Sequence, residues 1–199
     1  MSVAENDDNT KTSDNSPLNG QISKNEYINP KKEDLSEINQ SKESQVIKLI
    51  NNIILEIIAD NQKELTEKKV SNLPKTVFYM KNMPNIKFLE YLKRIIKYLK
   101  PEVSTLIIAL IYVDRICSEK TNKIVLIDNN IFKLFLTATI LAIKYNEDFY
   151  DDNSYFAKVG GITLNEMNIL ENELLDLIKF RLFVSVEIFS KYNDYLINY

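Results

Sequence analysis

Residues 130–145 read NIFKLFLTATILAIKY, a stretch that is apolar on almost every side if it is helical. Its polar residues Lys133, Thr137 and Lys144 fall on one narrow stripe. A helix of this kind is either wrapped by other helices or spans a membrane. A span requires about 20 apolar residues, and this run is shorter and flanked by charged residues. We therefore predict that it is the buried central helix of an all-α domain.

The residues at and around this stretch indicate where the helix ends and how closely it packs. Asp128 and Asn129 precede it and are residue types that cap helix N-termini. Ala138 and Ala142 lie four residues apart, so a neighbouring helix can approach closely on that side. Lys144 lies near the C-terminal end, where the helix dipole favours a cation.

The composition restricts the possible classes of function. The chain has 199 residues, of which 45% are hydrophobic, enough for one domain with a core and a tail. Its formal net charge of −3 argues against general nucleic-acid binding. Its single cysteine, Cys117, excludes an internal disulfide and favours an intracellular location, in the nucleus or cytoplasm. The sequence shows no secretory signal and no transmembrane segment, so we expect no membrane partner.

The sequence offers little support for enzymatic chemistry. Histidine is absent, which removes the commonest general base and the commonest metal ligand. With only three glycines, a glycine-rich phosphate loop is impossible, and the common nucleotide-binding and hydrolase motifs are missing. We therefore expect no catalytic residue, no cofactor and no small-molecule substrate.

An acidic cluster follows the central stretch and consists of Glu147, Asp148, Asp151 and Asp152. It lacks the glycine and the bidentate spacing of an EF-hand calcium loop. We interpret it as a solvated helix end rather than a metal site, and we expect no bound metal.

The remainder of the chain reads as a tail, helices and connections. Residues 1–42 are polar and aperiodic, which predicts a disordered N-terminal tail. The domain is expected over residues 43–199, with an amphipathic helix over 44–60 and a linker over 61–75. Further helices are predicted over 84–100, 101–118, 152–159 and 163–180, and from 185 onward. Pro84 is expected in the first turn of its helix. Asp152 or Asn153 and then Thr163 are expected to cap the next two starts, with a chain reversal at Gly160-Gly161 between them. No strand alternation persists anywhere, which supports an all-α fold.

Several sequence strings, in order and with matching spacing, resemble those of cyclins. They are ALIYVDR (109–115), AIKYNED (142–148), YLKRIIKY (91–98), YFAKVGGIT (155–163) and EMNILENELLDLIKFRLFVS (166–185). The resemblance is closest to the short phosphate-pathway cyclins, also called P- or U-type, and covers roughly residues 45–197. It implies a single five-helix cyclin box, flanked by an N-terminal and a C-terminal helix.

The resemblance implies a non-catalytic subunit that binds a cyclin-dependent protein kinase as a heterodimer. Such a subunit activates the kinase by holding its C-helix in the active position. By motif position, Lys144 and Glu171 are implied to hold that helix. Glu171 also lies in an otherwise apolar stripe, which by itself indicates either a pair within the chain or an apolar interface. The two interpretations are compatible, because a mutual pair can also bond a partner's backbone.

The resemblance further implies a structural ion pair between Arg94 and Asp114, since buried charges persist only when they are paired. The helix that carries Arg94 lacks the MRAIL-type string and the tryptophan of some cyclins, and with them the residues of the substrate-docking patch that those cyclins form there.

Two other functions stay open at this stage. A cyclin-fold adaptor, for example in transcription, would bind partners without activating a kinase. A small all-helical enzyme would require a pocket with converging titratable groups.

Overall fold

The computed structural model describes residues 32–65, 76–119, 121 and 124–198, and it describes side chains from residue 44 onward. Every regular element in these ranges is a helix, which confirms the all-α fold. The helices are α1 (Lys32–Glu64), α3 (Phe88–Leu99), α4 (Val103–Ser118), α5 (Asp128–Asn146), α6 (Asn153–Gly160), α7 (Leu164–Leu177) and α8 (Val186–Asn198). None of them combines the length and hydropathy that a membrane span requires.

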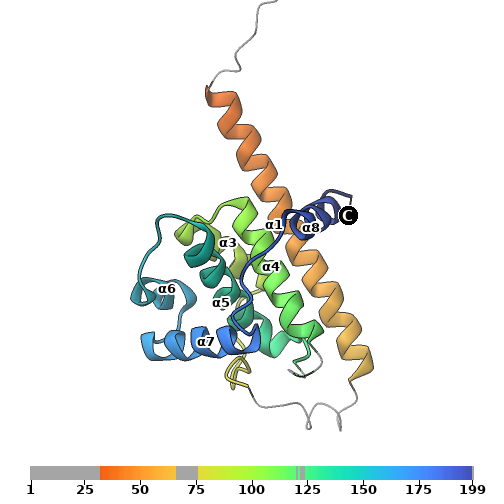
Figure 1. Ribbon diagram of the computed structural model, residues 1–199, viewed down its shortest axis with the longest axis vertical. Coiled ribbons are helices and arrows are strands. Elements are labelled where there is room, and N and C mark those ends of the chain that lie inside the picture. Colours follow the sequence, from red (N-terminus) through yellow and green to blue (C-terminus); the bar gives the residue numbers. More distant parts are fainter. Residues whose placement is uncertain (1–31, 66–75, 120, 122–123, 199) are drawn as a thin grey trace, which may run out of the picture.

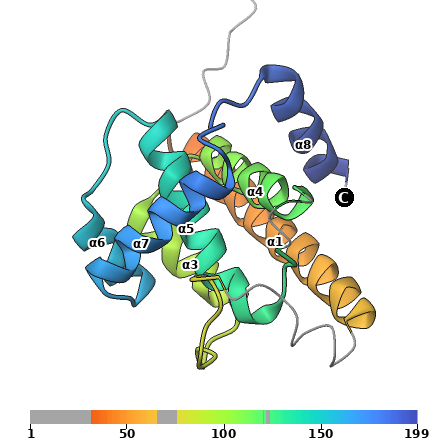
Figure 2. The same cartoon turned by 60° about the horizontal axis from the view of Figure 1, so that its bottom comes forward.

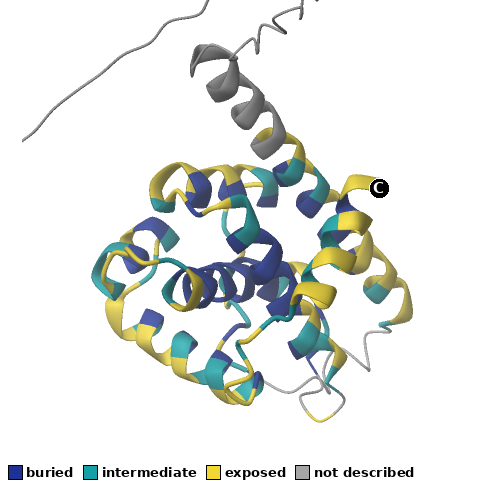
Figure 3. Ribbon diagram, turned by 45° about the horizontal axis from the view of Figure 1, so that its top comes forward, coloured by how far each residue is buried: buried dark blue, intermediate teal, exposed yellow. Residues whose placement is uncertain are grey.

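Helix α5 is the centre of the molecule, as its sequence predicts. Every residue from 134 to 143 is buried. Helices α3, α4, α6 and α7 pack directly against it, and the burial colouring shows the dark core surrounded by helices with exposed outer faces (Figure 3). The five helices α3–α7 correspond to the expected five-helix box. Because the other four helices surround α5, its apolar side chains are buried on almost every side.

Two buried threonines on α5 show how its polar stripe is accommodated. Thr137 and Thr139 are both fully buried. Each hydroxyl donates to the carbonyl one turn earlier in the helix, Thr137 to Lys133 and Thr139 to Phe135, both at 2.8 Å. The threonines therefore leave no unpaired donor in the core, and only the lysines of the stripe reach the surface.

The start of α5 differs from the sequence prediction, because the side chain that caps it is neither Asp128 nor Asn129. The buried Asn130 accepts a hydrogen bond from the backbone N–H of Ile127 at 3.0 Å. Its amide also donates to the carbonyl of Val125 at 2.8 Å. One asparagine thus satisfies two backbone groups that would otherwise be buried without partners.

Helices α1 and α8 flank the box on one side and lie against each other and against α4 (Figures 1 and 2). Helix α1 begins at Lys32 and ends at Glu64, so it is longer at both ends than the predicted helix over 44–60. The predicted tail therefore overlaps α1 in residues 32–42, and its residues 1–31 lie outside the described part of the chain. Most of the predicted linker, residues 66–75, also lies outside it.

Of the other three helix starts predicted from caps or a proline, two are confirmed. The predicted caps of α6 and α7 are confirmed, because Asp152 accepts from the N–H of Tyr155 at 2.8 Å and Thr163 from that of Glu166 at 3.1 Å. The predicted start at Pro84 is wrong, since α3 begins at Phe88.

The turn between α6 and α7 uses its two glycines differently. Gly161 has a φ of +72°, the left-handed conformation that glycine adopts without strain, as predicted. Gly160 lies so close to α5 that an added Cβ would be 2.4 Å from Leu136 Cδ2. The first glycine therefore allows close packing, and the second reverses the chain.

Cys117 gives an expected pH dependence of stability. Burial raises the pKa of its thiol to about 12, and the nearby Asp114 adds to the shift. An unfolded chain ionises this thiol first, so stability is retained below about pH 9 and declines as the pH rises toward 12. Urea unfolding at about pH 8 and about pH 10.5 should show a smaller decline for Cys117→Ala than for the wild type. Equal declines in the two proteins would contradict this assignment.

Candidate functional site

The structure brings Lys144 and Glu171 together at the surface edge of α5 and α7. Lys144 Nζ lies 2.5 Å from Glu171 Oε1, and the two side chains are only 24% and 15% exposed. The second oxygen of Glu171 accepts from Asn153 Nδ2 of α6 at 2.7 Å. Lys144 Nζ also lies 5.9 Å from the ring centroid of Phe156. Three helices therefore fix the position of this pair.

The ammonium group of Lys144 retains capacity for a partner. It carries three N–H donors, and Glu171 is the one acceptor it reaches among the described residues. The remaining N–H donors of Lys144 lie beside the Glu171 carboxylate, whose two oxygens already accept hydrogen bonds from Lys144 and Asn153. Such a cation can bind carbonyl oxygens of another protein without losing its own pair.

A second pair of the same composition joins the same two helices. Lys133 Nζ of α5 lies 2.8 Å from Glu166 Oε1 of α7. Eleven residues of helix, roughly 16 Å, separate Lys133 from Lys144 along α5. Both pairs attach α7 to α5. Lys144 and Glu171 therefore form an intrachain ion pair, which was one of the two interpretations of these residues.

The segment after α7 exposes aromatic side chains that sequence reasoning did not single out. Helix α7 ends at Leu177, earlier than predicted, and both Lys179 and Phe180 have positive φ, 56° and 55°. Non-glycine residues rarely adopt this conformation. Phe180 and Phe183 are 67% and 71% exposed. The sequence signal was available, since these phenylalanines follow the point where the helical period of α7 ends.

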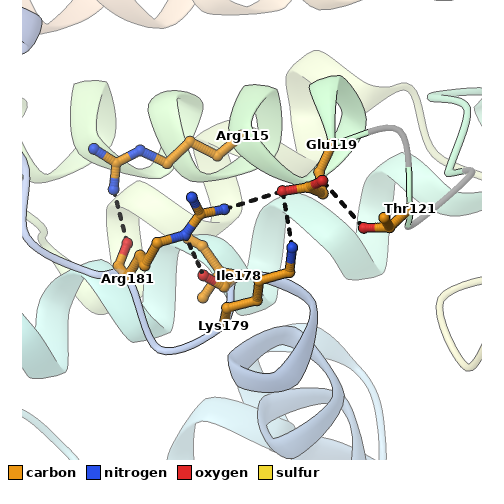
Figure 4. Close-up of polar contacts among 6 residues, drawn as sticks. All are labelled: Arg115, Glu119, Thr121, Ile178, Lys179 and Arg181. Atoms are coloured by element: carbon orange, nitrogen blue, oxygen red, sulfur yellow. Dashed lines mark hydrogen bonds and ion pairs between the residues drawn. The ribbon is translucent and has the colours of Figure 1, made fainter.

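Residues 178–185, which we call the pinned segment, are held against α4 by side-chain donors. Tyr112 Oη donates to the carbonyl of Leu182 at 2.7 Å. Arg115 donates to the carbonyls of Arg181 and Phe183 at 2.8 and 3.1 Å, and Figure 4 shows the first of these contacts. Two side chains of α4 thus fix three successive carbonyls, so Phe183 is displayed from a fixed backbone.

Glu119 attaches the pinned segment to the end of α4. One carboxylate oxygen accepts from Lys179 Nζ at 3.1 Å and from Arg181 at 3.2 Å, and the other from Thr121 Oγ1 at 3.1 Å (Figure 4). These bonds, that of Lys179 first, lower the pKa of the Glu119 carboxyl. The charged side chains of Glu119, Lys179 and Arg181 therefore pair with one another. Phe180 and Phe183 of the same segment remain exposed to solvent.

A groove of about 820 Å³ runs between α4 and the pinned segment, and Tyr145, Phe180, Phe183 and Ile188 contribute its apolar lining. Tyr145 directly follows Lys144 in α5, so one lining residue of the groove is the sequence neighbour of a member of the ion pair. The loop after α5 also exposes Phe149, by 90%. Clustered exposed aromatic residues around a half-buried charge are typical of protein interfaces.

The predicted ion pair between Arg94 and Asp114 is wrong. Within the part of the chain that the structure describes, Arg94 donates to the carbonyl of Lys158 at 3.2 Å, and Asp114 accepts from Tyr192 Oη at 2.5 Å and from Ser118 Oγ at 3.2 Å. The reason is that both side chains are exposed to solvent, so neither requires a counter-charge from the other. Arg94 instead faces α6, and Asp114 faces α8.

The acidic cluster after α5 contributes to local structure. Glu147 Oε1 accepts from the backbone N–H of Glu102 at 3.1 Å, and Asp152 caps α6. Among the described residues, no group of three or more His, Cys, Asp or Glu side chains is arranged to hold a metal ion.

A family model described as Cyclin matches residues 6–182. The chain belongs to the cyclin family. Cyclin-U2-1 of Arabidopsis thaliana is 34% identical over 74% of this cyclin and 65% of the relative. PHO85 cyclin-7 of Saccharomyces cerevisiae is 39% identical over 62% and 47%. The PHO85 cyclin-like protein psl1 of Schizosaccharomyces pombe is 32% identical over 83% and 71%.

These relatives confirm the predicted phosphate-pathway type. This cyclin spans 65% of the length of the first of them and 47% of the second. Members of the cyclin family are regulatory rather than catalytic subunits, and the family supports a role in regulating a cyclin-dependent kinase.

Proposed function

We propose that this chain binds a cyclin-dependent protein kinase and activates it by holding the kinase C-helix in its active position. The observation that carries this proposal is the half-buried Lys144–Glu171 pair, which Asn153 fixes, with exposed aromatic residues in the segments that follow α5 and α7. Two of the relatives are named as cyclins of PHO85, in budding and fission yeast, and their names support a kinase as the partner.

The mechanism is a shift in the population of kinase states. A protein kinase is active only when a lysine of its strand β3 forms an ion pair with a glutamate of its C-helix. A partner that binds the helix-in state more tightly than the helix-out state shifts the population by that difference in affinity. ATP, Mg²⁺ and all catalytic residues belong to the kinase, so this chain contributes a binding surface only.

The site offers complementary groups to the end of a helix. The last carbonyls of a helix have no partner within it and carry partial negative charge. The free donors of Lys144 can bind them, while the exposed Phe180 and Phe183 cover apolar side chains of the same partner helix. Glu171 keeps the ammonium group in position, because its own oxygens are held from two helices.

The double substitution Lys144→Ala/Glu171→Ala tests the site. We expect at least tenfold weaker kinase binding, since truncating buried, hydrogen-bonded charges at an interface costs about 2–5 kcal/mol. The kinase is first identified by affinity capture from the native cell with mass spectrometry. It is then produced with the chain, and affinity and kinase activity are measured in the purified pair.

The matched control is Lys133→Ala/Glu166→Ala, which removes the same residue types from the same two helices at the other end of α5. We expect it to retain kinase binding and activity. Equal losses in the two folded variants would refute the site. Capture of other proteins but no kinase with the wild-type chain would instead favour the adaptor function.

A further inference from the structure

Helix α3 and its two capping residues expose a group of cations that the proposed kinase site does not use. Lys87, Lys93, Arg94, Lys97 and Lys100 follow one another at spacings of one to six residues along its exposed side. Lys158 of α6 joins them, because Arg94 donates to its carbonyl at 3.2 Å. We call these six residues the basic face.

Most of the basic face lacks counter-charges within the chain. Lys93 is bonded to Glu90 at 2.8 Å, in an exposed pair. The other five cations have no carboxylate partner among the described residues, although the chain has a net charge of −3. Lys97 instead lies 5.5 Å from the ring centroid of Tyr98. The face therefore carries an uncompensated positive charge on an otherwise acidic protein.

The shape of the face indicates the size of its ligand. A hollow of about 520 Å³ is lined by Glu90, Lys93, Arg94, Lys97 and Tyr98. From Lys87 to Lys100 the helix rises by roughly 20 Å, the length of about six extended residues. Arg94 uses one nitrogen for the Lys158 carbonyl, which leaves the other donors of its guanidinium group for an anion.

From this charge and shape, we propose that the basic face binds a phosphorylated acidic peptide segment of a partner protein. A phosphate group carries nearly two negative charges and pairs well with arginine and lysine. A nucleic acid is a poorer fit, because the basic face is short and the protein has a net charge of −3. A partner bound here would be recruited to the protein at a surface separate from the kinase site.

Fluorescence anisotropy of the full chain with a labelled peptide tests the proposal. The peptide has about ten residues, rich in aspartate, with two phosphoserines separated by one residue. Their phosphates are then about 7 Å apart, close to the rise of about 6 Å between Lys93 and Lys97. We expect saturable binding that is at least tenfold tighter than for the unphosphorylated peptide and that weakens as salt rises from about 0.05 to about 0.5 M.

The variant Lys93→Glu/Lys97→Glu should weaken binding of the phosphorylated peptide at least tenfold. The control Lys48→Glu/Lys191→Glu changes the net charge equally at exposed positions of α1 and α8, and should bind like the wild type. Circular dichroism melting verifies that both variants are folded. Equal weakening in both variants would overturn the proposal, as would tighter binding to a duplex oligonucleotide than to the phosphopeptide. The assay contains no kinase, so its outcome is independent of the proposed function.

Discussion

Replacing Phe135 by alanine is expected to lower the free energy of unfolding by about 3–5 kcal/mol. Phe135 is fully buried at the middle of α5. Its ring packs edge-to-face on Phe88 of α3, with centroids 5.8 Å apart. Alanine loses the transfer free energy of the ring and leaves a cavity, because the surrounding helices relax only partly. Since domains are typically stable by about 5–15 kcal/mol, much of the stability depends on this ring.

Urea denaturation followed by circular dichroism measures the effect. The matched control is Phe180→Ala, which removes the same side chain from an exposed position and is expected to change the free energy by less than about 0.5 kcal/mol. A loss below about 1 kcal/mol for Phe135→Ala would mean that α5 is not packed as the structure shows.

Removing both exposed phenylalanines is expected to reduce kinase affinity by roughly a hundredfold to a thousandfold. Phe180→Ala/Phe183→Ala deletes two exposed aromatic side chains of the pinned segment that line the groove together with Tyr145. Aromatic residues at the centre of an interface commonly contribute at least 2 kcal/mol each. Titration of the purified kinase against the variant, by calorimetry, gives the change in dissociation constant.

The stability of the same variant separates binding from folding. Both phenylalanines are largely exposed, so we expect the unfolding midpoint in urea to stay at or above that of the wild type. The control Met83→Ala/Ile197→Ala removes exposed apolar side chains away from the pair and should bind the kinase normally. Wild-type affinity in the phenylalanine variant would exclude the groove from the kinase interface.

The sequence by itself determined the parts of the fold that depend on local pattern and on burial. The stretch 130–145 is apolar on almost every side, and only the centre of a helical domain accommodates such a surface in water. The caps at Asp152 and Thr163 and the turn at Gly161 were predictable because their chemistry involves neighbours within a few residues. Family motif positions implied kinase binding by Lys144 and Glu171, whereas their mutual contact was an alternative that the sequence left open.

Only the tertiary structure decided the features that depend on residues far apart in the chain. Whether Arg94 meets Asp114 is set by which helices cover α3 and α4, and α6 and α8 supply closer partners. The exposure of Phe180 and Phe183 depends on Tyr112 and Arg115, about 70 residues earlier, which hold the backbone of the pinned segment. Local propensity carries no information on such contacts, because their free energy arises only when the distant segments have packed together.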